Sequence, residues 1–474
     1  MQIEIYPRYW VNKPGFHLAI GGLVLFALAF GATALGIEPS WPYIVADAAV
    51  LITVLIWKFP AFLIVGLTFV GQFKSRAAAG FDVTDPTFVM LALLYIAVTV
   101  QLLLVTTGAG RYNLRDLFRG QAVGVSAFSL LILAIAVSYT YTPAPGVGGD
   151  KVLRLIVFDS LAFAAPLILL QNDRDVRQLV LFTTLASLLL AVVTLYRLLH
   201  PTAELLRGDQ DATQIGSGLV MDAAVLMLLY YPLKAKWSVR SGVMLCLIVL
   251  TLGIAASLSR SAVLCLLLVA TAGSLFMGLD SRVASRKVIL LSMAACILVP
   301  SIAFLWFRYL PAASSKFAFK AQELTMILQG SAPAGTVQQR IEFSESAWRA
   351  FLSKPLLGWG AGGWSTLWHY NDARIDVTYP HNFILEVAAE QGLAGLTPLA
   401  LLLLAISRAC ANVLQARSTQ LAFIVPVVTL SLIGNCFTGQ VASREMWSWC
   451  GILFAFARMV QLQPCPRSVG IPRS

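Results

Sequence analysis

FVMLALLYIAVTVQLLLV, residues 88–105, runs for 18 positions without a charged side chain. A helix needs about 20 predominantly apolar residues to cross the hydrocarbon core of a bilayer, so this segment approaches the length of a full crossing. Similar runs recur along most of the 474 residues. Only 12% of the residues are charged, against about 25% in soluble domains. The sequence therefore predicts an all-α, polytopic integral membrane protein.

We expect about 12 to 14 transmembrane helices, because several of the apolar segments are shorter than the roughly 20 residues of a full crossing. The candidate segments are 17–35, 41–57, 59–73, 86–107, 121–140, 152–170, 178–199, 215–231, 238–256, 260–278, 287–307, 393–412, 419–438 and 444–462.

Lysine and arginine gather in alternate connections between these segments. By the positive-inside rule, short loops rich in these residues face the cytoplasm. We therefore place both termini in the cytoplasm and the longest loop, 308–392, on the outer side. The basic loops are GRYNLRDLFRG, PLKAKWSVR, DSRVASRK and SRACANVLQARS.

This topology divides the chain into an N-terminal transmembrane bundle (1–307), a large outer loop with short helices (308–392) and C-terminal transmembrane helices (393–474). The net charge of +11 is then mostly topology signal beside anionic membrane lipids, which are expected partners. Nucleic acid is not an expected partner, because the sequence has no basic soluble domain. None of the seven cysteines lies in the outer loop, so no disulfide framework is expected.

The outer loop contains one amphipathic pattern. Ile341, Trp348, Phe351 and Leu352 recur at helical spacing, which predicts a helix over 339–353. Pro355 should end it. The same helix could lie on the bilayer surface with its tryptophan as an anchor, and the two interpretations are compatible.

GWGAGG, residues 358–363, formally matches the pattern G-x-G-x-x-G. No strand pattern precedes it and no βαβ unit surrounds it, so we reject a dinucleotide site. We expect a tight turn whose glycines let the backbone pass close to another helix or to a phosphate-bearing ligand. These glycines are Gly358, Gly360, Gly362 and Gly363.

His381 follows Pro380 and precedes a helical pattern on the expected outer side. The positive end of the following helix disfavours the imidazolium form. A neutral imidazole can act as a general base at neutral pH. The alternative is a histidine that only caps the helix or packs at an interface.

Four arginines are expected at the outer edge of the membrane. Guanidinium groups offer a planar fork of donors that suits phosphate oxygens. Snorkelling to headgroups and structural ion pairing are the alternatives. Arg260 lies in an otherwise apolar segment, where an ionisable residue indicates function. The four arginines are Arg260, Arg340, Arg207 and Arg154.

Carboxylates give a weaker signal. Asp209 and Asp211 form a D-x-D pair, which could hold a metal or simply pair with Arg207. Glu386 and Glu390 lie one turn apart on one helix face, where they could orient a sugar or face solvent. Three further aspartates fall inside apolar segments, where they could form a proton or ion path or fix helix packing: Asp47, Asp159 and Asp222.

Three stretches together resemble the O-antigen ligases and, more broadly, the O-antigen polymerase superfamily. His381-Asn382, nine further residues and then Gly392-Leu393-Ala394-Gly395 fit the ligase pattern H-[N/S/Q]-x9-G-x-x-G. LSRSA around Arg260 is similar to the Ser-Arg signature of the superfamily. RIEFSESAWRAFLSKPLLGWGAGGW is similar to its stretch of Arg, Trp and Pro-Leu-Leu-Gly-x-Gly.

The resemblance implies a GT-C-like glycosyltransferase of lipopolysaccharide biosynthesis in the inner membrane of a Gram-negative bacterium, with its site on the periplasmic face. The donor would be O-antigen polysaccharide on undecaprenyl pyrophosphate, and the acceptor would be a sugar hydroxyl of lipid A–core oligosaccharide. No cofactor and no metal are implied. His381 would deprotonate the acceptor, and Arg260 and Arg340 would stabilise the leaving pyrophosphate in a single inverting displacement.

Further residues complete the expected site. The expected substrate-binding residues are Arg207, Arg154, Tyr379, Asn382 and Glu386. The expected structural glycines are Gly358, Gly360, Gly363, Gly392 and Gly395.

Three other functions are kept as alternatives. A polymerase of the same superfamily would join lipid-linked repeat units, and a pilin-type O-oligosaccharyltransferase would use a protein hydroxyl as acceptor. A polysaccharide or ion transporter would explain the spans and the aspartates within them. Transporters are typically built from internal repeats, and none is clear in this sequence.

Overall fold

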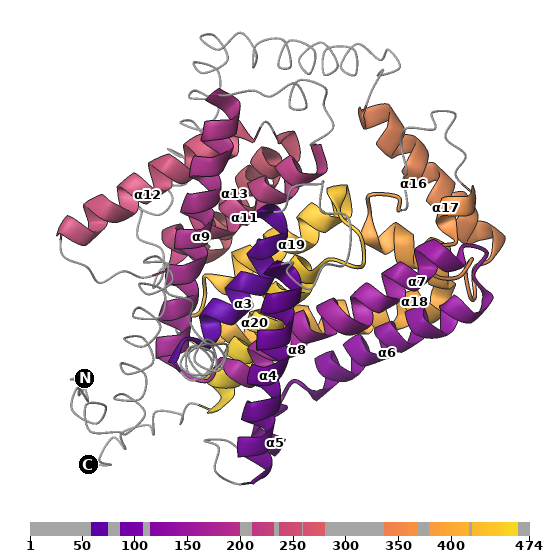
Figure 1. Ribbon diagram of the computed structural model, residues 1–474, viewed down its shortest axis with the longest axis horizontal. Coiled ribbons are helices and arrows are strands. Elements are labelled where there is room, and N and C mark those ends of the chain that lie inside the picture. Colours follow the sequence, from indigo (N-terminus) through magenta and orange to yellow (C-terminus); the bar gives the residue numbers. More distant parts are fainter. Residues whose placement is uncertain are drawn as a thin grey trace, which may run out of the picture.

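The computed structural model describes residues 58–73, 86–107, 114–199, 211–231, 237–257, 259–279, 336–367, 379–416 and 420–462. Every regular element among these residues is a helix. The long helices form a bundle, and α16 (Thr336–Ser353) and α17 (Trp364–Leu367) lie together at one side of it (Figure 1). The structure confirms the expected all-α, polytopic membrane architecture.

Each expected span within the described residues coincides with a helix, and those at 17–35, 41–57 and 287–307 lie outside the described residues. Five stretches of the described chain are long and apolar enough to cross a membrane: Thr87–Thr106, Ala122–Tyr141, Pro145–Leu169, Asp173–Tyr196 and Phe383–Gln415. The helices N-terminal to the outer loop are α3 (Pro60–Phe69), α4 (Pro86–Thr106), α5 (Leu114–Leu117), α6 (Ala122–Ser138), α7 (Pro145–Arg154), α8 (Ser160–Leu169), α9 (Asp173–Leu199), α11 (Asp211–Tyr230), α12 (Trp237–Ala256) and α13 (Arg260–Leu279).

Exposed leucines mark the lipid-facing sides of these helices. Leu103, Leu133, Leu189 and Leu404 are each more than half exposed, at 58%, 57%, 56% and 67%. Apolar surface of this extent is rare on soluble monomers and indicates contact with a partner or a membrane. Helices that are apolar all round are typical of membrane spans, because one side packs in the protein and the other faces acyl chains.

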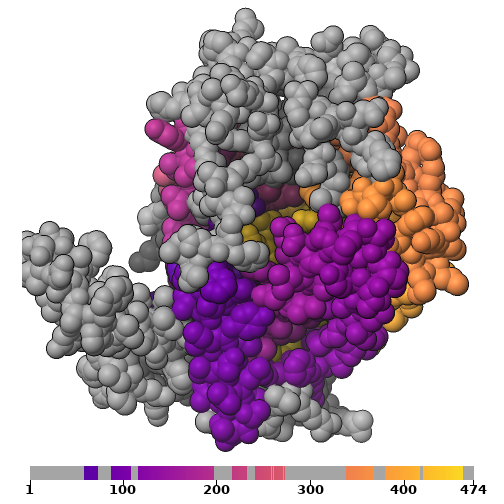
Figure 2. All heavy atoms as spheres, turned by 45° about the vertical axis from the view of Figure 1, so that its right-hand side comes forward, coloured from indigo at the N-terminus to yellow at the C-terminus, as the bar shows by residue number. Residues whose placement is uncertain are grey.

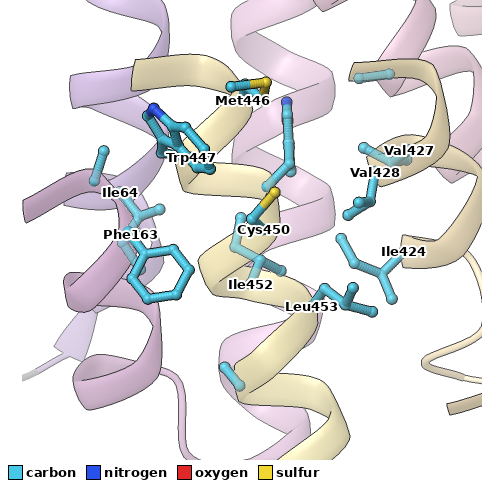
Figure 3. Close-up of a cluster of buried hydrophobic side chains, with 14 of the residues drawn as sticks. Ile64, Phe163, Ile424, Val427, Val428, Met446, Trp447, Cys450, Ile452 and Leu453 are labelled. Atoms are coloured by element: carbon cyan, nitrogen blue, oxygen red, sulfur yellow. The ribbon is translucent and has the colours of Figure 1, made fainter. Parts of the chain in front are cut away.

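Helix α20 (Arg444–Leu462) is the central helix of the bundle, since all its residues from Met446 to Met459 are buried. Figure 3 shows Trp447 and Cys450 among side chains of neighbouring helices, with Phe163 on one side and Val428 on the other. Lipid tails are as apolar as these side chains, so close packing is the main source of stability at this interface.

Arg458 is the one cation on the buried part of α20. Its guanidinium donates hydrogen bonds to the carbonyls of Leu117, Leu167 and Leu170. Two of these carbonyls belong to the C-terminal end of α8, where the last turn leaves carbonyl groups without helical partners. Arg458 therefore joins the ends of three segments at one end of the bundle.

Helix α18 (Phe383–Gln415) is interrupted at Gly392, which has φ of +61° and ψ of −149°. The interruption divides α18 into a short first part, which begins at Phe383, and a long second part that ends at Gln415. Gly392 is the last residue of the expected outer loop, so the kink falls where the chain was expected to enter the membrane.

The connections between helices gather at two ends. At one end, the Tyr141 hydroxyl donates to the Leu357 carbonyl at 2.6 Å, and a ring nitrogen of His381 lies 3.4 Å from the Thr438 carbonyl. The opposite end contains the Arg458 contacts. In Figure 2 the orange surface of α16 to α18 adjoins the purple surface of α6 and α7, so the expected outer-loop helices dock on one end of the bundle.

Candidate active site

Helix α16 confirms the amphipathic pattern, and it ends at Ser353, before Pro355. Its inner face buries Phe343, Ala347 and Ala350 against Trp364 and Ala389. Ala389 belongs to the first part of α18. The apolar spacing in the sequence therefore serves to attach α16 to the helix that begins just after His381.

The turn at 355–363 docks on the kink of α18 through backbone hydrogen bonds. Trp359 and Gly360 donate to the carbonyls of Ala389 and Glu390, at 3.0 and 2.8 Å. Leu393 and Ala394 donate to the carbonyls of Pro355 and Leu356, at 2.8 and 3.1 Å. A broken helix exposes carbonyls before the break and N–H groups after it, and each needs a partner when buried. The turn supplies partners for both sets.

Glycine is required where these two backbones meet. Gly358 and Gly360 have φ of +68° and +86°, a region that side chains disfavour. A Cβ on Gly358 would lie 2.3 Å from the Glu390 carbonyl carbon, and one on Gly392 would lie 2.6 Å from the Pro355 oxygen. The two alternatives for the GWGAGG turn were another helix and a phosphate ligand. The structure shows the helix.

The connection between α6 and α7 supports the turn from its other side. Thr142 donates from its hydroxyl to the Ala361 carbonyl at 2.7 Å. Gly148 lies so close that a Cβ there would be 2.3 Å from the same Ala361 oxygen. The sequence does not predict these contacts, because nothing local to residues 139–148 indicates a partner more than 200 positions away.

His381 lies directly before α18 in a left-handed conformation, with φ of +58°. Asn382 caps the helix: its side-chain oxygen accepts from the N–H groups of Ile384 and Leu385, at 3.0 and 3.1 Å. The imidazole stacks on Phe343 of α16, with 5.7 Å between ring centroids, and meets the Tyr379 ring at 4.6 Å. With the Thr438 carbonyl, the ring has three contacts, two of which come from distant segments of the chain.

The electrostatic surroundings lower the pKa of this histidine and so favour its neutral form. Burial lowers the pKa of His381, and the positive charge of Arg340 lowers it further, against a smaller opposing effect of the Thr438 carbonyl. The Thr438 carbonyl can only accept a hydrogen bond, so its 3.4 Å contact with Nδ1 favours the tautomer protonated there. Burial also raises the pKa of the Tyr379 hydroxyl. Arg340 lies one turn before Phe343 on α16, and its charge acts on His381. These two expected catalytic residues therefore belong to one part of the site.

Glu386 and Glu390 are fully buried, so solvent exposure, one of their two expected alternatives, is wrong. Lys151 of α7 lies between them, with its Nζ 2.6 Å from a carboxylate oxygen of each. The other oxygen of Glu386 accepts from the Val441 N–H at 2.6 Å. Glu386 thus contacts Lys151 and Val441 within the protein, and its expected sugar contact stays a prediction. Lys151 was missed, although a lysine on the side where basic residues are scarce could have indicated it.

Arg260 begins α13 at the same end of the bundle. Gly218 of α11 lies against this helix start, since a Cβ on it would be 2.6 Å from that of Ala262. The next residue of α11, Leu219, lies against Gly434, one turn before Thr438 at the end of α19 (Ile424–Thr438). Helix α11 therefore lies between the start of α13, where Arg260 is, and the end of α19, whose Thr438 faces His381.

The remaining expected residues are only partly described. Arg154 is exposed at the end of α7 and lies near the buried Asp159. Asp222 is buried, and among the described residues neither of its carboxylate oxygens has a hydrogen-bond partner. In the described part of the chain, no three His, Cys, Asp or Glu side chains converge as metal ligands would. Arg207, Asp209 and Asp47 lie outside the described residues, so their roles stay predictions.

The fold and the site together define a polytopic helical membrane protein with a partly buried histidine and an arginine at one end of its bundle. Residues 244–400 match the family model described as O-antigen ligase. This match spans about a third of the chain and includes Arg260, Arg340 and His381. It supports the expected membership of the O-antigen ligase superfamily. No curated protein matches the sequence.

Proposed function

We propose that this protein is an O-antigen ligase: a glycosyltransferase that moves O-antigen polysaccharide from undecaprenyl pyrophosphate to a sugar hydroxyl of lipid A–core oligosaccharide. The reaction would take place on the periplasmic face of the inner membrane. The observation that carries the proposal is the placement of His381, which stacks on Phe343 of α16, one turn from Arg340, within the residues that match the ligase family.

His381 is assigned as the general base. With its proton on Nδ1 facing Thr438, the ring presents the lone pair of Nε2 to a substrate. Nε2 removes the proton of the acceptor hydroxyl while that oxygen attacks the anomeric carbon. The bond from this carbon to the pyrophosphate oxygen breaks, and the leaving group takes the electron pair. A single displacement of this kind inverts the anomeric centre.

The leaving pyrophosphate gains negative charge as the bond breaks. Arg340 and Arg260 are assigned to stabilise it, because preorganised cationic donors at the site of developing charge lower the barrier. A lipid pyrophosphate is already an activated leaving group, so we propose that neither a nucleotide nor a metal is needed. Arg207 and Arg154 are assigned to more distant phosphate or sugar contacts.

Tyr379 is the best candidate for a sugar contact, because its ring lies directly against the base. Asn382 stays a proposed contact only through its side-chain NH₂ group, since its side-chain oxygen already caps α18. Glu386 is better assigned to a role within the protein.

Transfer between purified components tests the proposal. The protein in lipid nanodiscs would receive lipid-linked polysaccharide and lipid A–core, and the ligated product would be followed by gel mobility and mass spectrometry. Transfer to lipid A–core that survives EDTA is the expected result. Chains that lengthen on the lipid carrier would identify a polymerase instead, and transfer only to a pilin-type protein would identify an oligosaccharyltransferase. Loss of transfer on chelation, restored by magnesium or manganese, would contradict the metal-free mechanism.

A further inference from the structure

Two contacts join the beginning of α18 to residues 438–443, the segment between α19 and α20. The first is the 3.4 Å approach of His381 Nδ1 to the Thr438 carbonyl. The second is the 2.6 Å hydrogen bond that the Val441 N–H donates to a carboxylate oxygen of Glu386. The same helix start therefore holds both the base and the segment that faces the base.

The other side of this segment is fixed by α20. The indole N–H of Trp447 donates to the Val441 carbonyl at 2.8 Å, and Val441 itself is fully buried. Both backbone groups of Val441 are thus used, one by Glu386 and one by Trp447. Thr438 ends α19 three positions earlier, so these two side chains hold the chain directly after the carbonyl that faces His381.

A buried carboxylate can hold a backbone N–H only if its charge is compensated. Lys151 supplies that compensation, with its Nζ 2.6 Å from Glu386. Glu390 binds the same Nζ through both of its oxygens, at 2.6 and 2.8 Å. The two glutamates are therefore alike in burial and in their cation, but in the described structure only Glu386 also hydrogen-bonds to the 438–443 segment.

We infer that Glu386 is a positioning residue: it holds the 438–443 segment so that the Thr438 carbonyl faces Nδ1 of His381 and leaves Nε2 free as the base. This inference rests on the proposed function of His381. The competing interpretation is a purely structural ion cluster between α7 and α18. In that case the two glutamates would be equivalent, because both bind Lys151.

Three variants separate these interpretations. Glu386→Gln weakens the hold on Val441, and Glu390→Gln is its matched control with the same cation and the same burial. Trp447→Phe removes the opposite anchor of Val441 without touching the ion cluster. Thermal unfolding of each variant measures the purely structural effect, so that losses of activity can be compared at equal stability.

The first measurement is the tautomer and titration of His381, by ¹⁵N NMR of protein labelled at histidine. The chain has four histidines, so loss of a signal in His381→Ala assigns the resonance. Besides the Thr438 carbonyl, the charged or titratable groups acting on this ring are Arg340 and Tyr379, and both stay unchanged in the three variants. We expect Glu386→Gln and Trp447→Phe to alter the tautomer balance and the titration midpoint, and Glu390→Gln to leave them as in the wild type.

The second measurement is transfer. Misplacing a catalytic group by about 1 Å can cost on the order of 100-fold in rate, so we expect kcat to fall by ~10- to 100-fold in Glu386→Gln and Trp447→Phe, with the acceptor KM little changed. Their pH profiles should move together, whereas Glu390→Gln should keep the wild-type profile.

Equal pH profiles and equal titrations in Glu386→Gln and Glu390→Gln would overturn the inference. If Glu386→Gln does not fold, Trp447→Phe provides the test. An unchanged His381 titration in that variant would also overturn the inference. An inactive wild type would instead contradict the proposed function. The NMR titration would still decide whether Glu386 sets the state of His381, so the two failures are distinguishable.

Discussion

His381 adopts a backbone conformation that residues other than glycine seldom adopt, with φ of +58°. Such strain costs on the order of 1–3 kcal/mol and persists only where the surroundings enforce it. Here Asn382 caps the helix behind it and Phe343 packs on the ring. The sequence places a histidine at a helix start. It could not indicate this conformation, because Phe343 and Thr438 act on it from distant parts of the chain.

Replacement of His381 tests the base. His381→Ala should reduce transfer by roughly 10²–10⁴, the usual contribution of general base catalysis, while donor binding stays nearly normal. Steady-state kinetics with varied acceptor, together with binding of the lipid-linked donor, would measure both. A variant that regains the wild-type kcat at saturating acceptor would show that the histidine only binds the acceptor.

The pH profile of transfer has a definite sign. Burial and Arg340 lower the pKa of His381 from its ordinary value of about 6.5, so the neutral base persists below that pH. The rate should therefore begin to fall only at a lower pH than an unperturbed imidazole would allow. Arg340→Gln removes the positive neighbour, and the acid limb of kcat/KM should move to higher pH. An acid limb that stays in place in this variant would contradict the electrostatic coupling.

The arginines act through geometry as well as charge. Lysine keeps the charge of Arg340 or Arg260 but loses the planar fork that holds two phosphate oxygens. Arg→Lys should impair transfer and Arg→Ala should impair it more, by about 2.7–4 kcal/mol of transition-state stabilisation. Single-turnover kinetics with the lipid-linked donor would measure this loss. Full activity of a folded Arg260→Ala protein would remove that residue from the site.

At the scale of elements, the turn at 355–363 and the kink of α18 form one structure. The turn carries Pro-Leu-Leu-Gly-Trp-Gly and the kink carries Gly392, and each supplies the hydrogen-bond partners that the other lacks. Sequence patterns predicted the helix of α16, its end before Pro355 and a tight turn after it. They could not show that the turn binds a broken helix, since that pairing depends on backbone groups rather than on side-chain identity.

Gly392→Ala tests this interlock. A Cβ there would lie 2.6 Å from the Pro355 oxygen, and the φ of +61° alone costs a side chain about 1–2 kcal/mol. We expect a clear loss of thermal stability together with a loss of transfer, because the kink positions the helix that carries His381. Gly146→Ala is the matched control at the same end of the bundle, since nothing lies within 4 Å of its Cβ. Similar unfolding temperatures for both variants would contradict the interlock.

At the scale of the whole molecule, the alternation of basic loops predicts which connections share a side of the membrane. Two of these loops, PLKAKWSVR and DSRVASRK, lie mostly or wholly outside the described residues, so this stays a prediction. His381, Thr438, Lys151 and the start of α13 lie at one end, and the Arg458 contacts lie at the other. Composition was sufficient to predict the helical membrane architecture, because apolar length governs which helices can cross a bilayer. Composition and loop charge could not predict the buried Lys151 cluster, because its members pair across 235 positions or more of sequence.

The orientation of the bundle in the membrane can be tested directly. The site end should face the periplasm, because the basic connections belong to the opposite end. Arg349 reports on the site end: its side chain is 77% exposed, and its surface pair with Glu345 contributes little stability. Arg177, exposed near the start of α9, reports on the other end. In a background without the seven native cysteines, Arg349→Cys should react with a membrane-impermeant maleimide in intact spheroplasts, and Arg177→Cys should react only after lysis. The reverse pattern would place His381 in the cytoplasm, away from the lipid-linked polysaccharide and the lipid A–core that the proposed reaction joins.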